Sequence, residues 1–309
     1  MTKARLLPRC IVNADPDVAE SPNLATGTTV LQKIKLSVMQ FNVLADSLAY
    51  SAAFPLASTE CLKWSHRAPL ILEEIVRFSP TVVCLEEVDH FDELDAALRC
   101  EGYEGVFLKK SKGDSLDGCA VFYKTLEFKL GNRHDLLYRD ELNNDDNQVA
   151  LSVVLQHTRS SRKVHVVTTH LKAKDDFEDV RLEQIKVLSL FLTQECYATL
   201  PLVVCGDLNT ECDGPVYAHL MQLPTLKLDS AYRQFYGKEP PHTTLKHRPP
   251  ITRRRTIDYI FYSTQHFKSP SSVLRIPSEE EVGEAFLPCE RYPSDHIAIM
   301  SVLVLRPQL

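Results

Sequence analysis

Short apolar runs that end in polar side chains recur along this chain. One covers residues 201–205 and ends at Gly206, after which Asp207 and Asn209 stand two residues apart. Runs of this length predict buried strands, and a glycine lets the backbone turn sharply at a strand end. Side chains at i and i+2 of an extended chain point the same way, so Asp207 and Asn209 are expected to face one site. The alternative is a strand followed by an Asx turn, which the same residue types favour.

The pattern returns at five other places, namely residues 38–42, 81–87, 164–170, 256–262 and 292–305. The polar side chains placed in or beside these runs are Asn42, Glu87, His170, Asp258, Asp295 and His296. Polar groups at the ends of otherwise apolar strands indicate a single site at one edge of a sheet core. Carboxylate and amide groups gathered there suit Mg²⁺, or a water molecule that attacks phosphorus.

Between the strand-like runs, apolar residues recur at the spacing of a helix. This spacing predicts helices over residues 64–78, 91–99, 176–197 and 214–223. Residues 148–156 and 163–169 are expected to form an antiparallel pair of strands. A mixture of αβ alternation and paired antiparallel runs predicts an α/β protein with mixed sheets.

The candidate site residues extend from Asn42 to His296, which predicts one catalytic domain over residues 34–309. Residues 1–33 contain three prolines and are expected to form an irregular leader. Residues 240–252 are polar and contain proline, and we expect a long loop there.

Composition excludes several classes of protein. The chain has 309 residues, a formal net charge of −6 and nine cysteines. A negative charge disfavours a protein that coats long nucleic acid, and the absence of CxxC pairs disfavours a zinc site or a disulfide framework. No apolar run reaches the roughly 18–20 residues that span a bilayer, so no membrane partner is expected. The cytoplasm is the expected location. Three basic residues among the first nine leave mitochondrial import open.

Six motifs, taken in order, resemble the exonuclease–endonuclease–phosphatase superfamily. They are Gln40-Phe41-Asn42, Leu85-Glu86-Glu87-Val88, Thr169-His170-Leu171-Lys172, Gly206-Asp207-Leu208-Asn209, Thr256-Ile257-Asp258-Tyr259 and Ser294-Asp295-His296. The resemblance implies a four-layer α/β sandwich, in which two mixed β-sheets are flanked by helices. It also places the site at the mouth between the sheets.

The chemistry of these residues suggests a role for each. Glu87 is the best candidate for the principal Mg²⁺ ligand, because it is anionic and ends a strand. Asn42 can complete the metal shell or hold a phosphate oxygen. Asp207 can take the proton of an attacking water, and Asn209 can fix the position of Asp207 or bind phosphate.

The remaining roles concern charge that develops on phosphate. His296 and His170 can donate hydrogen bonds to phosphate oxygens. The resemblance implies that Asp295 also belongs to the site and that Asp258 orients a catalytic histidine. One residue departs from the family pattern, which usually has Gln where this chain has Glu86. Strand alternation would point Glu86 away from Glu87.

The residues that flank the motifs, such as Leu116-Asp117-Gly118-Cys119-Ala120, narrow the resemblance to a branch that removes the 2′-phosphate from NADP⁺ and NADPH. That branch usually has Arg where this chain has Lys174. The side chains expected to bind substrate are Lys110, Lys172, Lys174, Asn209 and Arg255. Two alternatives remain, a poly(A)-specific 3′-exoribonuclease and a catalytically inactive interaction protein. RNA is the less expected partner, and a monomer is expected.

Overall fold

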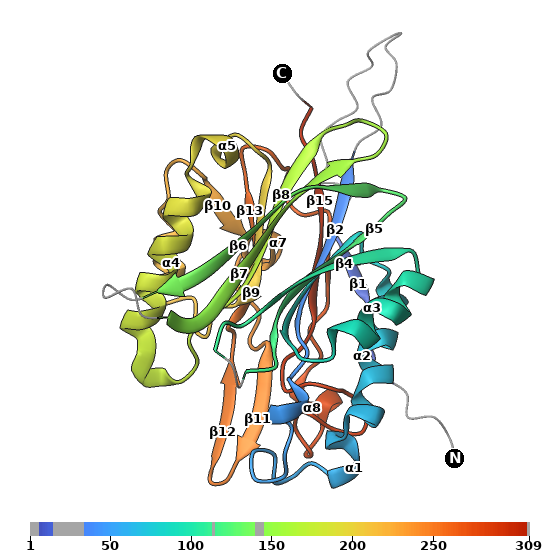
Figure 1. The fold of residues 1–309 in the computed structure, drawn as a ribbon. Coiled ribbons are helices and arrows are strands. Elements are labelled where there is room, and N and C mark those ends of the chain that lie inside the picture. Colours follow the sequence, from blue (N-terminus) through green and yellow to red (C-terminus); the bar gives the residue numbers. More distant parts are fainter. Residues whose placement is uncertain (1–5, 15–33, 113–114, 140–144, 308–309) are drawn as a thin grey trace.

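Two mixed β-sheets stand face to face in the computed structural model, which describes residues 6–14, 34–112, 115–139 and 145–307 (Figure 1). The first sheet has the strand order β1 (Ile11–Asn13), β14 (Ser272–Leu274), β15 (Ile299–Val304), β2 (Lys35–Asn42), β3 (Val82–Val88), β5 (Gly118–Lys124) and β4 (Tyr103–Lys109). The second has the order β10 (Leu228–Ser230), β13 (Asp258–Ser263), β9 (Leu202–Asp207), β8 (Lys163–His170), β7 (Asp145–His157) and β6 (Phe128–Arg139). Each sheet contains one parallel pair, β2 with β3 and β8 with β9.

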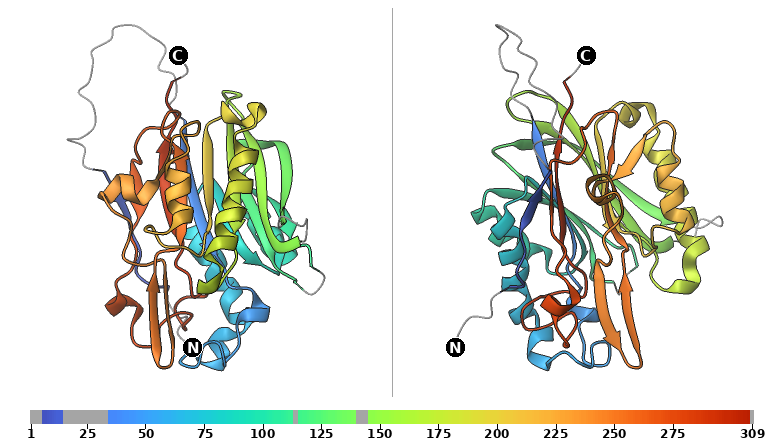
Figure 2. Two further views of the ribbon diagram at one scale, coloured as in Figure 1. Left: turned by 90° about the vertical axis from the view of Figure 1, so that its left-hand side faces the viewer. Right: turned by 180° about the vertical axis from the view of Figure 1, so that it is seen from behind.

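Helices cover the outer faces of both sheets (Figure 2). The longer helices beside the first sheet are α2 (Trp64–Phe78) and α3 (Phe91–Cys100), and those beside the second are α4 (Glu178–Leu192) and α6 (Pro215–Met221). The short helices are α1 (Thr59–Leu62), α5 (Glu195–Ala198), α7 (Ala231–Tyr236) and α8 (Glu279–Val282). The expected four-layer α/β sandwich is therefore confirmed. No helix among the described residues is long and apolar enough to cross a membrane.

The core has three layers because strand side chains alternate between the two faces of each sheet. In β3, Val82 and Cys84 point into the layer between the sheets, whereas Val83 and Leu85 pack under the helices. All four side chains are fully buried. A strand buried on both faces reads as a continuous apolar run, which is why β3, β8 and β9 could be predicted from sequence.

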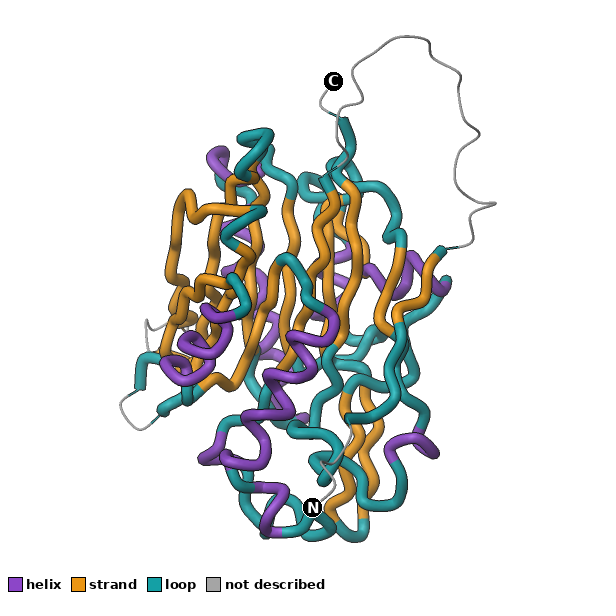
Figure 3. Tube along the Cα trace, turned by 90° about the vertical axis from the view of Figure 1, so that its right-hand side faces the viewer, coloured by secondary structure: helices purple, strands orange, loops and turns teal. Residues whose placement is uncertain are grey.

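The structure differs from the expected long loop at residues 240–252. A two-stranded ribbon, β11 (Thr244–Arg248) and β12 (Ile251–Arg255), occupies most of that segment. Figure 3 shows it standing apart from the two large sheets. In β11 only Thr244 and Leu245 are buried, so the strand carries almost none of the apolar alternation that marks a strand.

Part of the expected leader also belongs to the fold. Residues 11–13 form β1, which pairs antiparallel with β14 at the edge of the first sheet. Just before it, the buried guanidinium of Arg9 donates to the Glu74 carboxylate of α2 over 2.7 Å and to the carbonyl of Ala298 over 2.6 Å. Residues 1–5 and 15–33 of the expected leader lie outside the described residues.

Arg9→Ala should lower the free energy of unfolding by about 3–5 kcal/mol, because it leaves the buried Glu74 carboxylate without its partner. Denaturant titration followed by circular dichroism measures the change. Arg99→Ala is the matched control, because Arg99 pairs with Asp95 at the surface, and its loss should change the free energy of unfolding far less. Equal, small effects of the two substitutions would mean that Arg9 does not anchor the segment.

Candidate active site

The carboxyl ends of four strands bring the candidate residues together. Asn42 ends β2, Glu87 lies at the end of β3, His170 ends β8 and Asp207 ends β9. Because β2 runs parallel to β3, and β8 to β9, these ends meet at one edge of each sheet. The sheets face each other, so both edges border the same mouth.

The Asn42 side chain connects the two sheets at this mouth. Its Nδ2 donates to Glu87 Oε1 in the first sheet and to Asp207 Oδ2 in the second, each over 3.1 Å. Its Oδ1 accepts a hydrogen bond from the backbone of Leu44. Asn42 is completely buried, so this amide is held between two carboxylates.

Glu87 reaches the site through an irregularity in β3. The register with β5 shifts between Leu85 and Val88, and Glu87 has a φ of 55°. Regular alternation would have turned its side chain toward the helices. Burial raises the pKa of Glu87, and the nearby Asp295 raises it further, while His296 and Lys110 oppose this.

Asp207, Asn209 and His170 form a compact group on the other side of the mouth. The backbone N–H of Asn209 donates to Asp207 Oδ1 over 2.9 Å, which is the Asx turn considered as the alternative, and Asn209 Nδ2 lies 3.1 Å from His170 Nε2. Burial raises the pKa of Asp207 to about 7, with Asp258 and Glu87 acting in the same direction and His296 opposing them. Burial, with Lys110 and His296, lowers the pKa of His170 well below its usual range, so His170 is neutral.

His296 carries a positive charge in this arrangement. Its Nδ1 lies 3.0 Å from Asp258 Oδ2, and its Nε2 lies 3.6 Å from Asp207 Oδ2. Burial alone would lower the pKa of His296, but Asp258, Asp207 and Asp295 outweigh it and raise that pKa to about 10. Asp295 stays ionised, because Lys246 and His296 overcome the effect of burial and bring its pKa to about 2.

Glu86, the departure from the family pattern, lies between the sheets. Its Oε1 accepts from the Thr168 hydroxyl over 2.5 Å, and its Oε2 accepts from Gln40 Nε2 over 2.8 Å. The same Gln40 nitrogen donates to Asp258 Oδ1. Burial raises the pKa of Glu86 well above its usual range, and the nearby Asp258 and Asp207 act in the same direction.

A cavity of about 640 Å³ opens onto this group. Asn209, Lys174 and Arg255, three of the residues expected to bind substrate, line it together with Glu87, His170, Asp207, Asp295 and His296. Lys110 and Lys172 are not among its lining residues. Lys110 pairs with Asp117 over 2.6 Å, and the Lys172 ammonium lies over the Phe177 ring.

The β11–β12 ribbon forms one wall of the cavity, and besides Arg255 it contributes Lys246 and Arg253, which the motifs did not indicate. Lys246 pairs with Asp295 over 2.6 Å, and Arg253 and Arg255 both pair with Asp175. Thr243, directly before β11, donates its hydroxyl to Asp258 Oδ2 over 2.6 Å. The available signal was the run Arg253-Arg254-Arg255, but such a run is usually a solvated loop.

Two groups of side chains could hold a divalent cation. Ligand atoms of Asp207, Asp258 and His296 lie within 4.8 Å of one another. An imidazolium cannot ligate a metal, however, and His296 is held protonated by Asp258. Glu87 fits better, because this carboxylate lines the cavity and its burial without a cation is unfavourable. Asn42 currently turns its amide nitrogen toward Glu87, so its oxygen would ligate only after the amide rotates.

Comparison with known proteins connects this site with a large family. The model of the Endonuclease/Exonuclease/phosphatase family matches residues 39–296. Nocturnin from Rattus norvegicus is 38% identical over 279 residues, which cover 86% of this chain and 64% of the rat protein. The human nocturnin catalytic domain with bound sulfate matches with a TM-score of 0.75 and 31% identity, and covers 96% of this chain and 98% of that one. The residues that flank the six motifs predicted a resemblance to one branch of the family, nocturnin. The similarity to the rat and human nocturnins confirms that resemblance.

A second group of relatives is also similar. Carbon catabolite repressor protein 4 homolog 3 from Arabidopsis thaliana is 30% identical over 191 residues, which cover 60% of this chain and 42% of that protein. The chain therefore spans less than two thirds of the length of the rat nocturnin and of this plant protein.

Asp258→Asn should lower the pKa of His296 below about 10, because the substitution removes the largest interaction that opposes burial. Histidine NMR signals followed against pH in metal-free protein measure this. Asp135→Asn, at the exposed pair with Arg133, is the control and should leave the titration unchanged. An unaltered His296 titration in Asp258→Asn would contradict the assigned pairing.

Proposed function

Because the chain belongs to the endonuclease/exonuclease/phosphatase family, whose members hydrolyse phosphoesters, we propose that it removes the 2′-phosphate from NADP⁺ and NADPH with the help of Mg²⁺. One observation carries the proposal. A cavity of about 640 Å³ joins the cluster of Glu87, Asp207 and His296 to a wall bearing Lys174 and Arg255. That volume lies in the usual range for small-molecule sites.

In the proposed reaction a water molecule attacks the phosphorus, the bond between phosphorus and the ribose 2′-oxygen breaks, and that oxygen takes up a proton from solvent and leaves as a hydroxyl group. Asp207 takes the proton of that water, and its pKa of about 7 suits a general base near neutral pH. The His296 cation donates a hydrogen bond to a phosphate oxygen, where negative charge develops. Glu87, with Asn42, would hold Mg²⁺, and a cation bound there supplies charge neutralisation at the phosphate.

The basic wall supports a substrate with two separate anionic groups. The reacting 2′-phosphate belongs at the carboxylate and histidine cluster, which leaves the pyrophosphate for Lys174, Arg253 and Arg255. Arg255 already pairs with Asp175 over 2.8 Å and with Glu211 over 3.0 Å. A pyrophosphate with more charge than one carboxylate can replace Asp175 there.

The second candidate function is a poly(A)-specific 3′-exoribonuclease, and the similarity to the carbon catabolite repressor protein 4 homologue favours it. An exonuclease needs a basic track that follows the RNA backbone. The arginines of β12 are instead paired with Asp175, Glu211 and Glu279 in a chain of net charge −6. The third alternative, a catalytically inactive interaction protein, is disfavoured because the candidate catalytic side chains meet in one cavity.

The proposal also covers the cellular compartment, the extent of the catalytic unit and the oligomeric state. Its nine cysteines are all free thiols, which suits a reducing compartment, and we place it in the cytoplasm, with mitochondrial import as the alternative. We propose that residues 34–309, with β1 added, form the catalytic unit and that it acts as a monomer.

The decisive test compares two substrates with one preparation of protein. Phosphate release from NADPH should be rapid in the presence of Mg²⁺, and NAD⁺ should not be consumed. An oligo(A) RNA should not be shortened under the same conditions. Efficient shortening of oligo(A) with NADPH left intact would replace the phosphatase by the exoribonuclease.

Glu87→Gln should reduce turnover by at least about 10²-fold, because it keeps the shape of the side chain and removes the charge that holds the cation. Phosphate release at saturating NADPH and Mg²⁺ measures the loss, and circular dichroism checks the fold. Glu183→Gln, at an exposed pair with Lys186, is the control and should leave the rate unchanged. Near-normal turnover in Glu87→Gln would remove Glu87 from the metal site.

Lys174→Ala should raise KM for NADPH about tenfold or more, the loss expected for one charge-assisted contact of about 1.5–3 kcal/mol. The value of kcat should change less, since Lys174 is assigned to binding. Lys186→Ala removes the same charge outside the cavity and should leave both constants unaltered. A KM that stays the same in Lys174→Ala would mean that Lys174 does not bind the substrate.

A further inference from the structure

A second cavity, of about 520 Å³, lies at the opposite end of the sheets from the candidate active site. Its lining includes Lys163, which begins β8, and Pro201, which precedes β9. His170 and Asp207 stand at the other ends of these two strands, about 20–25 Å away for strands of six to eight residues. In Figure 1 β15, which leads to Arg306 and Pro307 of the lining, runs toward the end of the molecule opposite the β11–β12 ribbon.

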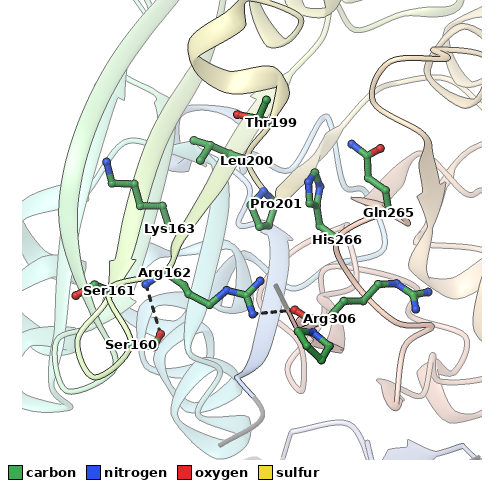
Figure 4. A pocket seen from close by; sticks show the side chains of 11 residues that line it. Ser160, Ser161, Arg162, Lys163, Thr199, Leu200, Pro201, Gln265, His266 and Arg306 are labelled. Atoms are coloured by element: carbon green, nitrogen blue, oxygen red, sulfur yellow. Dashed lines mark hydrogen bonds between the residues drawn. The ribbon is translucent and has the colours of Figure 1, made fainter. Parts of the chain in front are cut away.

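The lining of this distal cavity is basic. Arg162, Lys163, His266 and Arg306 come from three separate parts of the chain, and the remaining lining residues are Ser160, Ser161, Thr199, Leu200, Pro201, Gln265 and Pro307. Among the described residues, no carboxylate lines the cavity. Figure 4 shows the Arg162 side chain extending toward the backbone of Arg306, to which its guanidinium is hydrogen-bonded.

The charges of this cavity are not neutralised within the part of the chain that the structure describes. No carboxylate there lies within 4.0 Å of the charged groups of Arg162, Lys163 or Arg306. The arginines elsewhere are mostly paired, for example Arg133 with Asp135 and Arg275 with Glu281. Arg162, Lys163 and Arg306 share one cavity without such a partner, in a chain whose acidic residues outnumber its basic ones, 41 to 35.

Hydrogen bonds hold two of these side chains in place. Arg162 Nη1 donates to the carbonyl of Arg306 over 2.8 Å, and Arg306 Nε donates to the carbonyl of Phe267 over 3.0 Å. A guanidinium has five N–H donors, so most of those on each arginine are free for a ligand. Burial lowers the pKa of Arg162, and burial together with the charge of Arg162 lowers the pKa of His266. A bound anion would stabilise the protonated forms of Arg162 and His266 and so oppose both decreases in pKa.

We propose that this distal basic cavity binds a compact anion with several phosphate charges, such as a di- or triphosphate group. Planar guanidinium groups match phosphate oxygens with paired hydrogen bonds, and the serine and threonine hydroxyls can donate to the same oxygens. His266 is the single aromatic side chain in the lining, and no Phe, Tyr or Trp offers a broad platform for a nucleobase there. Recognition therefore falls on the phosphates.

The test uses inorganic triphosphate as the probe and the full-length chain without added metal. Isothermal titration calorimetry gives the affinity, and the NMR titration of His266 reports on this cavity alone, since the active site lies at the far ends of the strands. Triphosphate should raise the pKa of His266. The double variant Arg162→Gln/Arg306→Gln should abolish that shift and weaken binding in this cavity about tenfold or more.

The matched control is Arg99→Gln/Arg133→Gln, which removes two positive charges at exposed ion pairs outside the cavity. The control should leave the affinity for triphosphate and the His266 titration as in the unaltered chain. If the double variant Arg162→Gln/Arg306→Gln loses thermal stability, the single variant Arg306→Gln takes its place. A His266 titration that triphosphate does not move would overturn the proposal. If the control variant weakens triphosphate binding as much as the cavity variant does, the proposal is also overturned, because the binding would then depend on overall charge and not on this cavity. Neither readout involves substrate turnover, so the result is independent of the proposed phosphatase activity.

Discussion

The site depends on one amide that lies between two carboxylates. Glu87 and Asp207 belong to different sheets, and their charges repel each other across the mouth. The Asn42 amide donates to both, which offsets part of that repulsion and fixes the spacing of the two sheets at this edge. Farther along the strands the layer between the sheets is built from apolar side chains, which need no hydrogen-bonding group between them. At this polar mouth, therefore, the Asn42 contacts contribute both to the packing of the sandwich and to the chemistry of the site.

Sequence could predict the strands that supply the site, because β3, β8 and β9 are buried on both faces and read as continuous apolar runs. It could not predict how Glu87 enters the mouth, since strand alternation turns that residue outward and only the local irregularity of β3 turns it back. The long exposed strand β6 was missed for another reason. Most of its side chains are exposed on both faces, so its apolar period is weak.

The β11–β12 ribbon shows a third limit of sequence patterns. Its residues are mainly exposed and charged, yet Thr243 and Lys246 hold Asp258 and Asp295 in place. These contacts join segments that are 15 and 49 residues apart. No local period encodes such a contact, because it depends on where the ribbon folds against the Ser294–His296 segment. The candidate catalytic side chains and Asp258 could be selected from motifs, whereas Thr243 and Lys246, which contact Asp258 and Asp295, emerged only from the fold.

The order of strands in the first sheet has a consequence for synthesis of the chain. β2 pairs on one side with β15, and β1 pairs with β14, so strands from the start of the described chain depend on partners made more than 200 residues later. Contacts this distant in sequence form slowly and leave strand edges unpaired in the meantime. As the chain leaves the ribosome, β2 and the segment around Arg9 remain exposed until the final strands emerge. His296 arrives with those same strands, so the site is completed at the same moment as the sheet.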